Sequence, residues 1–100
     1  MVKHIVMWTL KDSAAGADKA ANARKMKELL EALPAKIPFL RELSVGIEVF
    51  AATPPCDVIL YSSFDTRDDL DAYQVHPEHL KVVAFVKQVV AARSVLDYEV

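Results

Sequence analysis

The sequence predicts an α+β fold, in which six elements follow one another as strand, helix, strand, strand, helix and strand. Two segments repeat apolar residues every three or four positions, as amphipathic helices do. Four short segments rich in β-branched residues are apolar at alternate or successive positions, as strands are. The chain has 100 residues, of which 53% are hydrophobic and 26% charged. This length and composition support one core, so we expect a single domain over residues 1–100.

The first half of the chain is expected to hold a strand, a helix and a second strand. Val2–Leu10 is apolar at both parities in its middle, which predicts a strand buried on both faces. After a polar loop over residues 11–17, helical spacing of apolar residues predicts one helix that ends near Pro34. Leu40–Phe50 alternates between apolar and polar residues and predicts a half-exposed strand. The apolar positions of the helix are Ala23, Met26, Leu30, Leu33 and Ile37.

The second half is expected to hold a strand, a broken helical region and a last strand. Asp57–Phe64 should pair with the preceding strand as a hairpin, because a proline-containing turn separates the two. Asp65 is the expected N-cap of a short helix over residues 66–74. Pro77 should begin a further helix, since proline suits the first helical position. The alternation over Arg93–Val100 predicts the final strand.

This order of elements is the split βαβ, ferredoxin-like pattern, an antiparallel four-stranded sheet with helices on one face. It places the first and third strands at the centre, and these are the two that are apolar on both faces. If His4, Val6 and Trp8 face the helices, Ile5 and Met7 face away and lack a cover. A second copy packed on the open sheet face would cover them, so we expect a homodimer, a dimeric α+β barrel.

Charge and hydropathy exclude several classes of partner. The formal net charge of -2, with signs interspersed, offers no basic stripe for phosphates, so we expect no nucleic acid partner. No apolar run is long enough to span a bilayer, and the N-terminus lacks the features of a signal peptide. We therefore expect no membrane association and a cytoplasmic location. The single cysteine, Cys56, cannot form an internal disulfide and is expected to be incidental.

The segment from Tyr73 to His79 gathers most of the titratable chemistry, and His4 would join it if the first strand passes beneath. His79 follows a helix-starting proline, where exposed backbone N–H groups disfavour the imidazolium, so a neutral ring is expected. A hydrogen bond between Tyr73 and His79 would suit proton abstraction beside a carbonyl. The histidine would take the proton, and the phenol would stabilise the oxyanion. Such chemistry requires no cofactor.

Other interpretations of these residues stay open. A tyrosine and a histidine can merely satisfy local polar groups, which would make them structural. His4, His76 and His79 could be metal ligands, but their spacing is loose and no fourth ligand has a suitable spacing, so we predict no metal. Trp8 and the helix residues could line a ligand cavity or fill the core. The residues expected to bind a ligand are His4, Val6, Trp8, Met26, Leu30 and His76.

Over nearly its whole length, the chain resembles the stress-responsive A/B barrel domain (Dabb) family. The resemblance implies a homodimer built by packing two sheets face to face. Most members have no settled activity, and plant members are associated with stress responses. One plant member, olivetolic acid cyclase, is a polyketide cyclase that closes a ring without a cofactor. The similar segments are Val2–Val6, Leu43–Gly46, Phe64–Asp65, Tyr73–Pro77, His79–Val83 and Asp97–Tyr98.

The resemblance also implies roles for particular side chains. The catalytic tyrosine and histidine of the cyclase match Tyr73 and His79, and its further pocket histidines match His4 and His76. The pocket wall departs from that pattern, because the cyclase has aromatic residues on its first helix where this chain has a methionine and a leucine. The substrate therefore does not carry over.

Three functions follow from the residues and the resemblance together. The first is a homodimeric barrel with a small, mostly apolar pocket that binds a small apolar, carbonyl-containing molecule. The second is a cofactor-independent lyase, cyclase or isomerase that uses Tyr73 and His79 for proton transfer. The third is a purely structural barrel. A cofactorless monooxygenase of the same architecture fits the signature less well.

Overall fold

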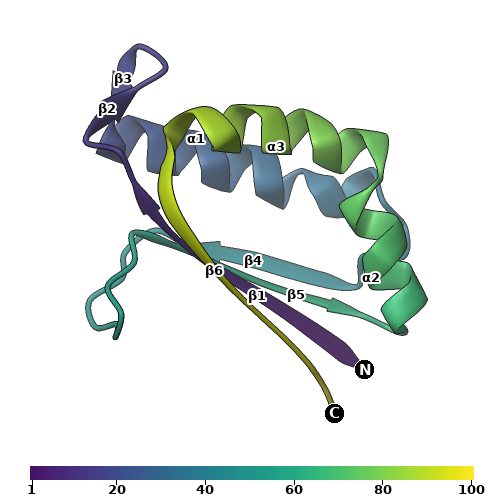
Figure 1. Cartoon of the computed structure of the whole chain (residues 1–100). Helices are drawn as coiled ribbons and strands as arrows, with labels where there is room; N and C mark the ends of the chain where they lie inside the picture. Colours follow the sequence, from purple (N-terminus) through teal and green to yellow (C-terminus); the bar gives the residue numbers. More distant parts are fainter.

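The computed structural model describes residues 1–100 and consists of a four-stranded antiparallel sheet with helices on one face (Figure 1). The strands lie in the order β4-β5-β1-β6. The central strands are β1 (Val2–Leu10) and β5 (Val58–Phe64), and the edge strands are β4 (Glu42–Gly46) and β6 (Val90–Glu99). This order confirms the predicted ferredoxin-like fold, with its first and third long strands at the centre.

Two long helices and one short helix cover the sheet. They are α1 (Lys19–Glu31), α2 (Arg67–Gln74) and α3 (Pro77–Val89). Helix α1 ends before Pro34, which lies in the short 3-10 helix η1 (Leu33–Ala35), because proline lacks an N–H and its ring clashes with the carbonyl one turn back. The helix ends before Pro34 as predicted, but Leu33 and Ile37, which were expected on its apolar face, lie in and after η1. None of the helices combines the length and the apolar character that a membrane span needs.

The expected polar loop before α1 contains a small hairpin, β2 (Ser13–Ala14) and β3 (Ala17–Asp18). Its two turn residues, Ala15 and Gly16, have φ values of 50° and 75°. Two central residues with positive φ match the twist of a two-residue hairpin, and glycine adopts this conformation easily. Strands this short carry no periodicity, so the sequence pattern did not reveal them.

The predicted bounds of two strands and one predicted cap are wrong. Strand β4 stops at Gly46 rather than residue 50, because its last partner on β5 is Ile59 and the chain beyond has no neighbouring strand. Strand β6 begins directly after α3, three residues earlier than expected. Thr66 caps α2 by accepting a hydrogen bond from the Asp69 backbone N–H at 3.1 Å. The Asp65 carboxylate instead forms an ion pair with Arg41, with 2.7 Å between Oδ2 and Nη2.

Alternate residues of β1 face opposite sides of the sheet. His4, Val6 and Trp8 face the helices and are buried, whereas Ile5 and Met7 lie on the open face and are only partly buried. Because β1 is hydrogen-bonded on both edges, to β5 and β6, its register fixes which side chains reach which face. The structure therefore fulfils the condition under which the sequence leaves Ile5 and Met7 on the open face.

Candidate functional site

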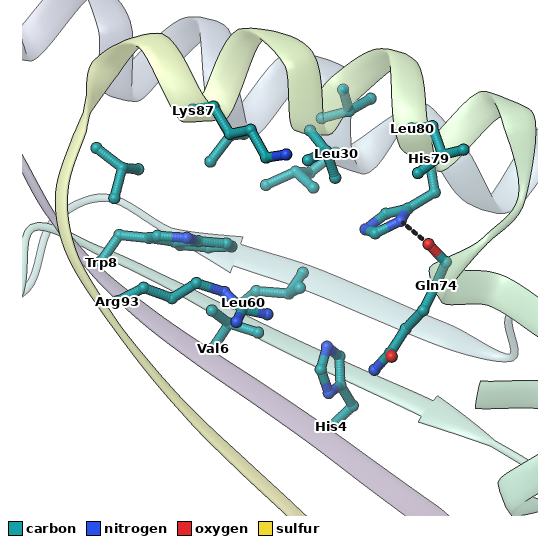
Figure 2. Close-up of a pocket in the computed structure, with 14 residues that line it drawn as sticks. His4, Val6, Trp8, Leu30, Leu60, Gln74, His79, Leu80, Lys87 and Arg93 are labelled. Atoms are coloured by element: carbon teal, nitrogen blue, oxygen red, sulfur yellow. Dashed lines mark hydrogen bonds between the residues drawn. The ribbon is translucent and has the colours of Figure 1, made fainter. Parts of the chain in front are cut away.

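A cavity of about 370 Å³ lies between the central strand and α3 (Figure 2). Strand β1 supplies His4, Val6 and Trp8 from one side, and α3 supplies a largely apolar wall from the other. Of the 14 residues that line it, nine are hydrophobic. Besides the three residues of β1, the lining residues are Leu30, Leu60, Gln74, His79, Leu80, Val82, Val83, Val86, Lys87, Val90 and Arg93.

One imidazole, His79, enters the cavity from the first turn of α3. Its Nδ1 lies 3.1 Å from the backbone carbonyl oxygen of Gln74. Since a carbonyl oxygen only accepts, Nδ1 carries the proton and Nε2 is the acceptor of the neutral ring. Burial lowers the pKa of His79, and nearby positive charge, including that of Arg93, acts in the same direction. The neutral ring agrees with the sequence prediction, but its main cause is burial rather than the helix terminus.

The other imidazole, His4, is held by a carboxylate from the neighbouring edge strand. Its Nδ1 pairs with Oδ1 of Asp97, which lies directly opposite it in the register of β1 and β6. A carboxylate acceptor on one ring nitrogen fixes the orientation of the ring and leaves Nε2 free for a second partner. His4 itself is 3% exposed, whereas the Asp97 side chain is 42% exposed. The pair therefore links the buried His4 ring to an exposed carboxylate on the edge strand β6.

Tyr73 lies behind the two histidines and does not line the cavity. Its ring centroid is 4.3 Å from that of His79 and 6.3 Å from that of His4. The buried hydroxyl group has no hydrogen-bond partner, so the predicted hydrogen bond between Tyr73 and His79 is wrong. The Tyr73 and His79 rings instead pack against each other with an interplanar angle of 40°. Burial raises the pKa of the Tyr73 phenol, which keeps it protonated and able to donate.

Two further residues expected in the pocket have other roles. Met26 is fully buried within the core and does not line the cavity. His76 is the N-cap of α3, where its Nδ1 accepts a hydrogen bond from the Glu78 N–H at 3.1 Å and its ring packs near Phe39. No group of three or more His, Cys, Asp or Glu side chains is arranged to hold a metal ion. Of the three histidines, His4 and His79 therefore line the cavity, and His76 caps α3.

Sequence reasoning missed the polar residues that complete the cavity wall. Lys87 and Arg93 both extend into it, and the Gln74 side chain lies near His4 (Figure 2). Arg93 is directly opposite Trp8 in the register of β1 and β6, which puts both side chains on the helix-facing side. Alternation along the last strand puts Arg93 and Asp97 on the same face. Only the register with β1 shows that this is the face that carries Trp8 and His4.

A ferredoxin-like sheet with a cavity between its central strand and its last helix defines a small α+β protein of the barrel class. The chain matches the Stress responsive A/B Barrel Domain, abbreviated Dabb, over residues 2–100 and belongs to this family. No curated protein matches the sequence. Family membership therefore comes without an assigned ligand or reaction.

Solved structures resemble this fold closely. A dimeric protein of unknown function from Bacteroides fragilis is 36% identical, with a TM-score of 0.86 over 99% of this chain and 95% of that chain. A dimeric ferredoxin-like protein of unknown function from Thermobifida fusca is 24% identical, with a TM-score of 0.83 over 99% and 90%. A hydroxynitrile lyase from Passiflora edulis is 18% identical, with a TM-score of 0.79 over 99% and 92%, a likeness of fold alone.

His79 is expected to make the folded protein sensitive to mild acid. Its folded pKa lies below the value of about 6.5 that an unfolded histidine has, so the unfolded chain binds the proton more readily. This group leaves the free energy of unfolding unchanged above about pH 6.5 and lowers it as the pH falls toward the folded pKa. His79→Gln should therefore flatten the pH dependence of stability, measured by urea denaturation between about pH 5 and 7.

Val75→Gln provides a matched control, because Val75 is 70% exposed and lies near the same helix without a titrating group. It should retain the slope of the unsubstituted protein. Equal slopes in the unsubstituted protein and in His79→Gln would show that His79 titrates normally when folded.

Proposed function

We propose that this Dabb protein binds a small, mostly apolar organic molecule that bears a carbonyl group, in the cavity between β1 and α3. The observation that carries the proposal is the cavity itself, about 370 Å³ in volume and predominantly apolar. Pockets that bind small molecules typically measure about 300 to 1,000 Å³ and present few, well-placed polar groups to an apolar ligand. The cavity meets both criteria.

Trp8 supports a ligand with a hydrogen-bond acceptor. It lines the cavity, is 5% exposed, and its indole N–H has no partner in the protein. A buried donor without a partner costs about 1 to 3 kcal/mol, and a carbonyl oxygen is an acceptor that would relieve this cost. The Gln74 amide, which also lines the cavity, offers a further donor.

A second candidate function is cofactor-independent proton transfer. His79 presents a neutral imidazole to the same cavity, with a lowered pKa and a free Nε2, which are the properties of a general base near neutral pH. Tyr73 packs against this ring with a protonated hydroxyl group that has no partner. Because Tyr73 is buried and does not line the cavity, its side chain would have to shift for the hydroxyl group to reach an oxyanion there. The hydroxynitrile lyase shares only the fold and lends no residue role.

Binding of 2-octanone tests the proposed function. Trp8 is the only tryptophan, so its fluorescence reports directly on the cavity. We expect saturable quenching on titration with the ketone, and its loss in Val86→Phe, since Val86 lines the cavity and a phenyl ring would fill part of it. The control Val75→Phe makes the same change at an exposed position and should bind normally.

The same samples separate binding from catalysis. In D₂O, a general base at His79 would exchange the protons beside the ketone carbonyl for deuterium, observed by NMR, and His79→Gln would stop the exchange. Quenching without exchange supports a binding protein. The absence of both, in a folded protein, contradicts the ligand-binding proposal and favours a purely structural barrel.

We also propose that the protein forms a homodimer through the open face of the sheet. Leu96 and Tyr98 of β6 are 57% and 42% exposed there, beside partly buried apolar residues of β1 and β5. Lys3 and Tyr61 on this face are already hydrogen-bonded to each other at 2.7 Å, so an interface could cover them without leaving either unpaired. The relatives from Bacteroides fragilis and Thermobifida fusca are described as dimeric.

Leu96→Asp should convert the dimer into a monomer, because a carboxylate would be buried in the interface without a partner. Light scattering should give twice the chain mass of 11.1 kDa for the unsubstituted protein and for the control Val75→Asp. A monomer at micromolar concentration in the unsubstituted protein would refute this arrangement, as would a dimer that is indifferent to Leu96→Asp.

We also propose that the chain is one domain that works in the cytoplasm. Its single cysteine, Cys56, is free, as is usual in a reducing compartment. Recovery of the protein in a membrane or secreted fraction of its native cell would contradict this location.

A further inference from the structure

Two cationic side chains extend into a cavity whose wall is otherwise mostly apolar. Lys87 comes from the last turn of α3 and Arg93 from the start of β6, and both point toward the cavity interior (Figure 2). Neither takes part in any ion pair of the structure. Both residues are exposed, so their charged ends remain in contact with water while the side chains lie along the cavity wall.

No carboxylate among the lining residues balances these charges. The lining contains no Asp or Glu, and the nearest acidic side chain along β6, Asp97, is already paired with His4. The charge of Arg93 also reaches His79, whose pKa it lowers. The cavity therefore gathers two positive charges beside neutral groups. Like charges repel each other, and an anion bound beside both side chains would relieve this repulsion.

We propose that the natural ligand is an amphipathic anion, with a carboxylate held by Arg93 and Lys87 and an apolar body along Val6 and Trp8. This inference rests on the proposed function and specifies the chemical class of the ligand. A guanidinium presents parallel N–H groups that match the two oxygens of a carboxylate, and an ammonium adds a point charge. The body of such a molecule would cover the apolar floor while its carbonyl or hydroxyl group meets the histidines.

Octanoate and 2-octanone test the inference, because both have eight carbons and only one is charged. Titrations followed by Trp8 fluorescence should show that octanoate binds roughly 10-fold more tightly or better, as expected for charge-assisted hydrogen bonds. Arg93→Gln should reduce octanoate affinity by roughly 10-fold or more while changing 2-octanone affinity by less than about 2-fold. Lys87→Gln should give a smaller loss of the same kind, since a single ammonium lacks the paired geometry.

Arg24→Gln is the matched control, because Arg24 is exposed on α1, lies outside the cavity and forms no ion pair. It removes one positive charge and should leave octanoate binding unchanged. Equal binding of the two probes, or full octanoate affinity in both Arg93→Gln and Lys87→Gln, would overturn the inference while leaving the proposed function intact. Failure of both probes to bind the unsubstituted protein would overturn the two together.

Discussion

The alternation of side chains along β1 is the constraint on which the rest of the structure depends. This strand lies at the centre of the sheet, with β5 on one edge and β6 on the other, and both of its faces are apolar. A shift of one residue would exchange the two sets of side chains, moving His4 to the open face and Met7 beneath the helices. Pairing on both edges prevents such a shift. The fold thereby uses one strand to build the cavity floor and a second apolar surface.

The two histidines of the cavity are held by partners that fix the orientation of their rings. His79 donates from Nδ1 to a backbone carbonyl, and His4 pairs through Nδ1 with Asp97, so both rings keep Nε2 for a ligand. Trp8 and Tyr73 retain buried donors without partners. Buried donors of this kind are rare in native proteins because each costs free energy. Only the Trp8 donor lines the cavity, where a bound acceptor could satisfy it, whereas Tyr73 packs against His79 outside the lining.

The sequence predicted the fold because its signals are local. Periodicity located β1, β5 and the helices, and connection rules arranged them into a sheet. The candidate site was only partly predictable, because its members depend on relations between distant segments. Helical spacing could not separate Met26, which packs in the core, from Leu30, which lines the cavity. The roles of Asp97 and Arg93 follow from a strand register that no sequence pattern encodes. The orientation of the Tyr73 hydroxyl group depends on ring packing.

The most direct test of the account is to locate a bound ligand by NMR, using neighbouring residues of β1 as reporters of the two faces. Val6 and Trp8 line the cavity, whereas Ile5 and Met7 lie on the open face of the sheet. Bound 2-octanone should give nuclear Overhauser effects to the Val6 methyl groups and the Trp8 indole ring. Effects to Ile5 and Met7 without any to Val6 or Trp8 would contradict the account, because the ligand would then occupy the opposite face of the sheet.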